Sequence, residues 1–359
     1  MIKHAFLLVS LMISKQKAFF FRIENISQIH HFREVIKLLL RDGCSVVIMT
    51  RDYQSSDYTE FGTKLTLIDA RLSPIIFRYR AFVAVSQNMR PPFLGKAKYI
   101  MPYGYFAKGI SIPRFRDGYN YFCSICPFMT DYLLKNLKID IKILPIGYPK
   151  SDSYFLDEGI DIRKKIISEK SVLIAPSHEE ESALLEHIGE YTEKLLAKNY
   201  SVYIKIHPVY STSTTIYRKK IDSLINKGLG TYVKFVYPGD DELLAYKTWL
   251  TITDYSSIAN EAMSVLNGVI LVDSPRFYNE FLKKNYPLVD WAKVVAEPAI
   301  NSCYMQASII SSPEQLDEAI TFEKKNCKSS SRTQYSEKLL YNRGGASLAF
   351  GELLRKNHV

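Results

Sequence analysis

The chain has 359 residues, of which 47% are hydrophobic and 23% are charged, and its formal net charge is +10. This composition excludes a disordered chain, and the length predicts two domains of ordinary size. No run of about 18 apolar residues occurs, which excludes an ordinary transmembrane helix. The basic residues are spread along the chain without an arginine-rich or glycine-rich tract, so an anionic membrane surface or substrate is favoured over nucleic acid.

Residues 5–13 form the first apolar run. Their length fits the core of a signal peptide, but the following residues 14–17 offer no small-residue cleavage site. We therefore expect residues 5–13 to be a strand or helix of the fold, or an interfacial anchor.

Short apolar runs alternate with helical patterns in the first half of the chain. A strand is predicted at 18–23, and a helix follows that is capped by Ser27 and ended by Asp42 and Gly43. Pro127 opens another helix. Further strands are predicted at 45–49, 81–85, 98–101 and 119–125. This alternation predicts a parallel sheet covered on both faces.

The cysteines indicate reduced thiols and no disulfide framework. Cys123 and Cys126 have C-x-x-C spacing, but no second pair or histidine cluster accompanies them. Buried thiols are therefore favoured over zinc binding or redox chemistry.

Residues 143–152 contain two prolines and a glycine and are predicted to be a hinge. The second half then restarts the pattern, with helices predicted at 182–198 and 241–246. Its strands are predicted at 171–175, 202–206, 233–236, 250–252 and 269–272. This pattern predicts a second doubly wound domain.

Polar segments follow several of these strands. They are Pro176-Ser177-His178, His207-Pro208, Gly239-Asp240 and Asp254-Tyr255-Ser256-Ser257. Ligands of parallel sheets bind beyond the carboxyl ends of the strands, so these segments are candidates for a binding site.

The segment 253–262 is the most informative of these. Asp254-Tyr255-Ser256-Ser257 joins a buried strand to a helix, which places two hydroxyls and several backbone N–H groups at a helix start. That combination suits a phosphate or diphosphate. The alternative is that Ser256 or Ser257 only caps the helix.

Other cofactor signatures are missing from the sequence. No Gly-x-Gly-x-x-Gly follows a predicted strand and no Gly-x-x-x-x-Gly-Lys-Ser/Thr occurs, which argues against nicotinamide, flavin and P-loop chemistry. No Asp-x-Asp pair supports a metal-dependent mechanism. We expect neither a cofactor nor a metal.

The predicted fold is α/β of the GT-B type, with two Rossmann-like doubly wound domains facing a central cleft. Residues 1–150 would form an acceptor-side domain, residues 151–330 a nucleotide-donor-binding domain, and residues 331–359 a C-terminal helical tail.

Five motifs in this order resemble the CDP-glycerol glycerophosphotransferase family, which includes the teichoic acid polymerases and primases. They are Gly147-Tyr148-Pro149-Lys150-Ser151-Asp152, Ala175-Pro176-Ser177, Lys205-Ile206-His207-Pro208, Asp241-Glu242-Leu243-Leu244 and Thr253-Asp254-Tyr255-Ser256-Ser257. The likeness covers roughly residues 80–280, and the tail 342–347 also fits it. The Asp-Tyr-Ser-Ser block is its most specific element.

The resemblance implies transfer of a glycerophosphoryl or related polyol-phosphoryl group from a CDP-linked donor. His207 would lie beside the donor diphosphate, Ser256 and Ser257 would hold it, and Glu261 would lie near the ribose. Ser177, Lys205, Asp254 and Gly147 are the other candidate substrate-binding residues.

The sequence departs from the family at one point. The family's usual His-Gly pair, whose histidine is thought to act as general base on the acceptor hydroxyl, is matched here by Tyr103-Gly104. A tyrosine of ordinary pKa, near 10, is a poor base at neutral pH. Either nearby cations shift Tyr103, another residue takes the proton, or the chemistry differs.

Among the histidines, His207 is favoured as a functional residue, and the others are weaker candidates. His207 follows a strand, and as an imidazolium it would neutralise charge on the leaving CMP. His178 precedes three glutamates and is interpreted as part of a solvated loop or helix start. His30 and His31 are expected to be surface or acceptor-side residues and not metal ligands.

The sequence therefore predicts a transferase that builds a cell-surface polymer such as teichoic acid, capsule or O-antigen. Its partners would be a CDP-linked donor, a lipid-linked glycan or polyol-phosphate acceptor, and the anionic inner face of the cell membrane, where it would be a peripheral cytoplasmic protein. Two alternatives stay open: a GT-B glycosyltransferase that uses a nucleotide sugar, and a non-catalytic scaffold that binds nucleotide or polymer.

Overall fold

The structure is a computed structural model. It describes residues 18–23, 26–50, 58, 60–61, 65–69, 79–84, 97–102, 104, 118–136, 140–155, 167–177, 182–207, 210, 216–276, 280, 283–285 and 306–356.

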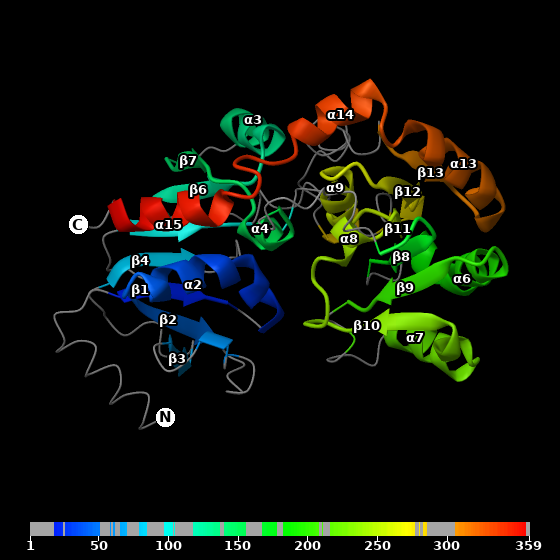
Figure 1. The fold of residues 1–359 in the computed structure, drawn as a ribbon, viewed down its shortest axis with the longest axis horizontal. Coiled ribbons are helices and arrows are strands. Elements are labelled where there is room, and N and C mark those ends of the chain that lie inside the picture. The colour runs from blue at the N-terminus through cyan, green and yellow to red at the C-terminus, as the bar shows by residue number, and fades with distance from the viewer. Residues whose placement is uncertain are drawn as a thin grey trace. The chain divides into compact units, whose positions relative to one another are not determined.

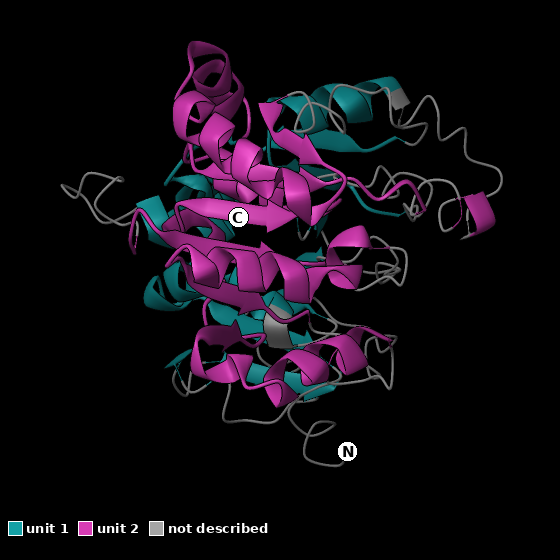
Figure 2. Cartoon of the chain, turned by 90° about the vertical axis from the view of Figure 1, so that its right-hand side faces the viewer, with its two compact units in different colours: residues 1–104, 110–158, 340–359 teal, residues 105–109, 159–339 magenta. Residues whose placement is uncertain are grey.

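Two parallel sheets organise these residues, one in each of two units (Figure 1). The first unit comprises residues 1–104, 110–158 and 340–359, and the second comprises residues 105–109 and 159–339 (Figure 2). The predicted pair of Rossmann-like α/β domains is confirmed.

In the described part of the first unit, seven parallel strands lie in the order β3-β2-β1-β4-β5-β6-β7. They are β1 Ala18–Arg22, β2 Ser45–Thr50, β3 Leu65–Asp69, β4 Tyr79–Ala84, β5 Ala97–Ile100, β6 Tyr121–Ser124 and β7 Lys142–Pro145. Its helices are η1 Ile26–His31, α2 Arg33–Arg41, α3 Pro127–Asn136, α4 Pro149–Phe155 and α15 Ala346–Lys356.

In the described part of the second unit, six parallel strands lie in the order β10-β9-β8-β11-β12-β13. They are β8 Ser171–Ala175, β9 Ser201–Lys205, β10 Val233–Val236, β11 Leu250–Thr253, β12 Gly268–Val272 and β13 Ser308–Ile310. Its helices are α5 Ala183–Glu186, α6 Ile188–Ala197, α7 Ile216–Asn226, η7 Leu229–Thr231, α8 Leu244–Lys247, α9 Ile258–Met263, α10 Lys283–Asn285, η9 Pro313–Gln315, α13 Leu316–Asn326 and α14 Ser330–Glu337.

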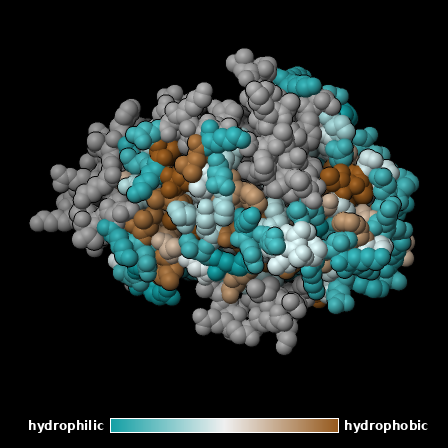
Figure 3. Space-filling view, turned by 90° about the horizontal axis from the view of Figure 1, so that it is seen from above, coloured by the Kyte–Doolittle hydropathy of each residue, from teal (hydrophilic) through white to brown (hydrophobic). Residues whose placement is uncertain are grey.

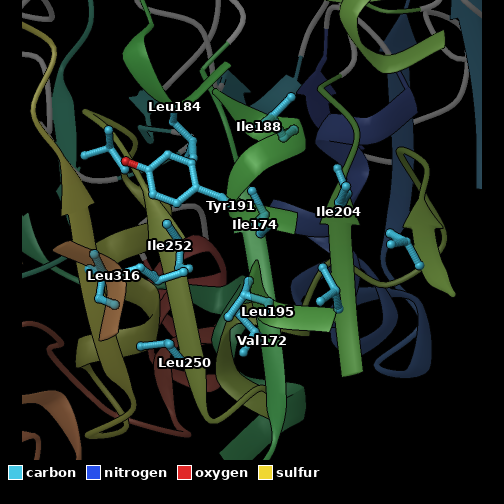
Figure 4. Packing of buried hydrophobic residues seen from close by; sticks show 14 of the residues in the cluster. Val172, Ile174, Leu184, Ile188, Tyr191, Leu195, Ile204, Leu250, Ile252 and Leu316 are labelled. Atoms are coloured by element: carbon cyan, nitrogen blue, oxygen red, sulfur yellow. The ribbon is translucent and has the colours of Figure 1, made fainter. Parts of the chain in front are cut away.

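Each sheet is buried beneath helices. In the second unit, alternate residues of β8 and β11 point to one face, where Val172, Ile174, Leu250 and Ile252 meet the apolar side of α6 around Tyr191 (Figure 4). In keeping with a parallel sheet covered on both faces, β8, β11 and β12 are buried along their whole length, including Thr251 and Thr253 of β11.

The C-terminal helix returns to the first unit. Phe350 and Leu354 of α15 belong to the first unit's core, and α15 packs against α2 (Figure 1). The sequence-based boundary at residue 150 therefore lies inside the first unit, which continues to residue 158. The predicted tail 331–359 is helical but divided, because α14 lies in the second unit and α15 in the first.

The segment before α15 is attached by specific contacts of the loop that follows β7. Asn342 donates its amide N–H groups to the carbonyl oxygens of Pro145 and Ile146, at 3.1 and 3.0 Å. Asp152 accepts the backbone N–H groups of Ala346 and Ser347 at the start of α15, at 3.2 and 2.5 Å. The segment 143–152 was predicted to be a hinge. It instead contains the end of β7 and the start of α4 and lies inside the first unit, where its residues bind the C-terminal segment.

A buried ion pair holds the far edge of the second sheet. Glu323 of α13 and Arg332 of α14 are almost fully buried and lie 3.0 Å apart. Glu323 also accepts the backbone N–H groups of Val269 and Ser308, at the starts of β12 and β13, both at 2.9 Å. These donors satisfy a charge that would otherwise be costly to bury.

Several elements differ from the sequence-based expectation. Strands β3, β7 and β13 were not predicted. The helix predicted to start at Ser27 is a 3-10 segment, η1, followed by α2. The helix predicted at 182–198 is interrupted at His187, where α5 ends and α6 begins. None of the described helices combines the length and apolar character that spanning a bilayer requires.

Candidate functional site

The second sheet changes direction between β8 and β11. From β8 the chain proceeds to β9 and β10 on one side, and it then returns to β11 on the other side. In parallel sheets, ligands bind beyond the carboxyl ends of the strands at such a switch point. Ser177 follows β8 and Asp254 follows β11, so two predicted site residues lie at this point.

Asp254 connects the loops after β8 and β11. Its carboxylate accepts the Ser177 hydroxyl at 2.6 Å and the Ser177 backbone N–H at 3.2 Å. It also accepts the Ser182 hydroxyl at 2.5 Å. Asp254 is only 1% exposed, so these donors compensate a buried carboxylate. Asp254 therefore fixes the loop after β8 to the loop after β11.

Ser182 was not predicted as a site residue. Its hydroxyl oxygen also accepts the Leu185 backbone N–H at 3.0 Å, which makes Ser182 the N-cap of α5. The capping residue type is visible in the sequence, but its contact with Asp254, 72 residues away, is not.

Ser256 and Ser257 precede α9 and are both half-buried. Their carbonyl oxygens accept the N–H groups of Ala259 and Asn260, at 3.3 and 3.1 Å, and the Ser256 hydroxyl receives only a long 3.4 Å contact from the Ile258 N–H. Within the described residues, the backbone N–H groups of Ser256 and Ser257 and the Ser257 hydroxyl have no protein partner. This group of donors is able to receive an anion.

Glu261 lies on α9, one turn after Ser257, and is 4% exposed. Its backbone carbonyl accepts the Ser264 hydroxyl at 2.7 Å. The Glu261 side chain is thus buried within the second unit.

His207 follows β9, the neighbour of β8, and is half-buried. Its backbone N–H donates to the hydroxyl of Tyr217 at 2.7 Å, and the two rings meet edge to face with centroids 6.3 Å apart. Tyr217 lies on α7 and is fully buried. Sequence analysis missed Tyr217, which resembles any core aromatic residue of an amphipathic helix.

Lys205, at the end of β9, is paired with an acid. Its ammonium group lies 3.1 Å from the Glu242 carboxylate and 3.4 Å from the carbonyl oxygen of Asp241. A second lysine, Lys247, lies 3.0 Å from the Asp241 carboxylate. Lys205 therefore attaches the 239–242 turn to β9. Its positive charge is already balanced by the Glu242 carboxylate.

The remaining predicted residues lie in or beside the first unit's sheet, or outside the described residues. Gly147 has a φ of +94°, and a Cβ atom there would lie 2.2 Å from the carbonyl oxygen of Tyr341. This close approach is sufficient to explain why residue 147 is a glycine, and no bound substrate is needed for that explanation. Tyr103 and His178 lie outside the described residues.

His31 is not at the surface. It is 8% exposed, and its Nδ1 atom lies 3.2 Å from the hydroxyl of Tyr148, which is fully buried. Tyr148 follows Gly147 and reaches His31 because α4 packs against η1 and α2. His30 and His31 were expected to be surface or acceptor-side residues. A surface position is wrong for His31, because α4 and α2 pack over the end of η1.

The two C-x-x-C cysteines are buried, as predicted. Burial raises the pKa of Cys126 to about 12 and that of Cys123 well above its usual value, so both thiols are protonated at neutral pH. Among the described residues, no cluster of three or more metal-ligating side chains occurs.

Two Rossmann-like units, the second with hydroxyl and N–H donors at a switch point, are characteristic of the GT-B fold. The fold is similar to that of the wall teichoic acid polymerase TagF, with a TM-score of 0.60 and 14% identity over 96% of this chain and 89% of that chain. It is also similar to a UDP-GlcNAc 2-epimerase from Neisseria meningitidis, with a TM-score of 0.57 and 14% identity over 94% of this chain and 100% of that chain. A glycosyltransferase from Rickettsia africae gives a TM-score of 0.51 and 11% identity, over 96% and 99% of the two chains.

Residues 104–265 match the family of CDP-glycerol:poly(glycerophosphate) glycerophosphotransferases. This segment contains the loops after β8, β9 and β11, and hence Ser177, His207 and Ser256. The predicted resemblance to this family is confirmed over residues 104–265. Comparison with curated protein sequences gives no significant match.

Proposed function

We propose that the chain transfers a glycerophosphoryl or related polyol-phosphoryl group from a CDP-linked donor to a teichoic-acid-like acceptor. The acceptor hydroxyl attacks the phosphorus that carries the polyol, the bond from that phosphorus to the CMP oxygen breaks, and CMP leaves. The observation that carries the site assignment is the group of unpartnered donors at Ser256 and Ser257. The wall teichoic acid polymerase TagF, a structure of which was soaked with CDPG, shares the fold.

In this proposal the donor diphosphate lies at Ser256 and Ser257, beyond the carboxyl end of β11. Asp254 and Ser182 hold the loops that form this place, and Ser177 takes part through its contact with Asp254. His207 neutralises negative charge that develops on the leaving CMP. Glu261 is proposed to lie near the ribose, as the resemblance implies.

Of the alternatives that the sequence leaves open for removal of the acceptor's proton, the proposal takes Tyr103 as the general base. Because the ordinary pKa of tyrosine is about 10, this assignment requires neighbouring cations that lower the pKa of Tyr103. Replacement of Tyr103 by Phe should then lower the rate of transfer and abolish the rise of that rate with pH that ionisation of Tyr103 produces, while leaving donor binding unchanged. A Tyr103→Phe variant with wild-type transfer rates would assign the proton to another group.

The acceptor is proposed to be lipid-linked and the protein to be peripheral on the inner face of the cell membrane. The net charge of +10 favours an anionic surface. In the first unit, Leu134 of α3 and Leu348 of α15 are large apolar side chains that are 70% and 53% exposed. Seen from above, the described surface combines hydrophilic areas with apolar patches (Figure 3).

A calorimetric titration tests the donor site. CDP-glycerol, CDP-ribitol, UDP-sugars and CMP-sialic acid are titrated into wild type and into the Ser256→Ala/Ser257→Ala double variant. The wild type should bind a CDP-polyol, and the double variant should bind it about 10–100-fold more weakly, because two hydroxyl donors are lost while the backbone N–H groups remain. Ser201→Ala, an exposed serine at the amino end of β9, is the matched control and should bind normally.

The same titration distinguishes the proposed function from a glycosyltransferase and from a non-catalytic scaffold. Selective binding of a UDP-sugar, with release of a nucleoside diphosphate, would indicate a glycosyltransferase, a function that the shared fold also permits. Binding of a CDP-polyol without CMP release, across several polyol-phosphate acceptors, would indicate a non-catalytic scaffold. No binding of any donor would show that Ser256 and Ser257 only cap α9.

A further inference from the structure

Tyr217 of α7 contacts the loop after β9 that carries His207. Its hydroxyl accepts the backbone N–H of His207 at 2.7 Å, and its ring meets the imidazole edge to face. Tyr217 lies in the first turn of α7 and its side chain is fully buried, so it is held in place by the core of the second unit. A rigid residue thus contacts the loop that carries His207.

The electrostatic environment keeps the Tyr217 hydroxyl neutral. Burial raises its pKa well above the usual value, the hydrogen bond from His207 N–H lowers it in part, and the charge of Asp254 raises it further. Asp254 therefore lies near enough to act on Tyr217, and Asp254 itself is held by Ser177 and Ser182. Asp254 thus joins the loops after β8 and β11, and Tyr217 contacts the loop after β9.

A second buried tyrosine of the same unit provides the comparison. Tyr191 of α6 is also fully buried, but within the described residues its hydroxyl has no hydrogen-bond partner. The hydroxyl of Tyr217 differs because it contacts a candidate catalytic residue directly. Burial alone does not account for that contact.

We propose that Tyr217 is a positioning residue for His207. Its hydroxyl fixes the His207 backbone, and its ring edge restricts rotation of the imidazole, so that the imidazole meets the donor in one orientation. This inference rests on the proposed function of His207 and deepens it. Because a reacting group must be placed within a fraction of an ångström, loss of this contact should reduce the rate more than it reduces donor binding.

The test is a double-mutant cycle on CMP release from the CDP-polyol. Tyr217→Phe in the otherwise wild-type protein should lower kcat about 10–100-fold with little change in the KM for the donor. In a His207→Ala background, the same change should have less than about a twofold further effect, because the group that it positions is gone. Tyr191→Phe, the matched loss of a buried hydroxyl, should leave kcat unchanged in both backgrounds.

Amide exchange provides a readout that does not depend on activity. The His207 amide proton should exchange faster with solvent in Tyr217→Phe than in wild type, and Tyr191→Phe should leave it unchanged. An equal loss of kcat with and without His207 would show a merely structural role, and wild-type behaviour of Tyr217→Phe would overturn the inference. A wild-type protein that releases no CMP would instead refute the proposed function.

Discussion

Two buried aspartates show how context decides what a residue type does. Asp254 receives two serine hydroxyls and a backbone N–H, all within the second unit. Asp152, in the first unit, receives only backbone N–H groups at the start of α15, and burial raises its pKa to about 6 from an ordinary value of 3.8, with the hydrogen bonds from Ser347 and Ala346 opposing the rise. Neither environment is visible from the residue's neighbours in the sequence.

Asp152 should give the first unit a measurable dependence of stability on pH. Because its folded pKa is raised, its contribution to stability is fully present below about pH 4 and is lost as the pH rises through about 6. The shift corresponds to roughly 3 kcal/mol. Urea unfolding at pH 4 and pH 7 should show this loss in wild type but not in Asp152→Asn. An equal change in both proteins would show that Asp152 does not titrate in this range.

At the scale of elements, the pattern of apolar residues in the sequence predicts most of the helices and strands. The buried face of α2, made by Val35, Ile36, Leu39 and Leu40, follows the helical period in the sequence. Strands β8 and β11 are apolar runs between polar ends and were predicted for that reason. Strand β3 was missed, because Leu65–Asp69 is a short segment that includes the polar residues Thr66 and Asp69.

Docking of the C-terminal segment on the first unit depends on Gly147. Gly147→Ala should destabilise the protein by about 2–4 kcal/mol, because alanine would be strained at a φ of +94° and its Cβ would overlap the carbonyl oxygen of Tyr341. Gly43→Ala is the control, since Gly43 has a φ of +76° but no atom within 4 Å of its Cβ position. That variant should lose only about 1 kcal/mol in urea unfolding.

The outcome also separates two interpretations of Gly147. Equal losses for Gly147→Ala and Gly43→Ala would show that the contact with Tyr341 contributes nothing. A Gly147→Ala variant that is as stable as wild type but binds donor or acceptor poorly would restore the predicted substrate-binding role.

At the scale of the whole molecule, the net charge of +10 leads to a prediction about membranes. The protein should bind anionic vesicles at about 10 mM salt, where the Debye length is about 30 Å, and should be released at about 1 M salt, where it is about 3 Å. Neutral vesicles are the control and should bind little protein in a sedimentation assay. Failure to bind anionic vesicles at low salt would refute the peripheral location.

The sequence by itself determined the two α/β domains, the strand ends that carry polar residues, and Ser256 and Ser257 at the start of a helix. These features are local, since they depend on the period of apolar residues and on residue types within a few positions. Only the tertiary structure decided that Asp254 binds Ser177 and Ser182, that Tyr217 accepts the His207 N–H, and that α15 joins the first unit. Those contacts join segments that are distant in the chain or carry no local sign of their pairing. Their partners are selected by the packing of whole sheets and helices, which no short window of sequence specifies.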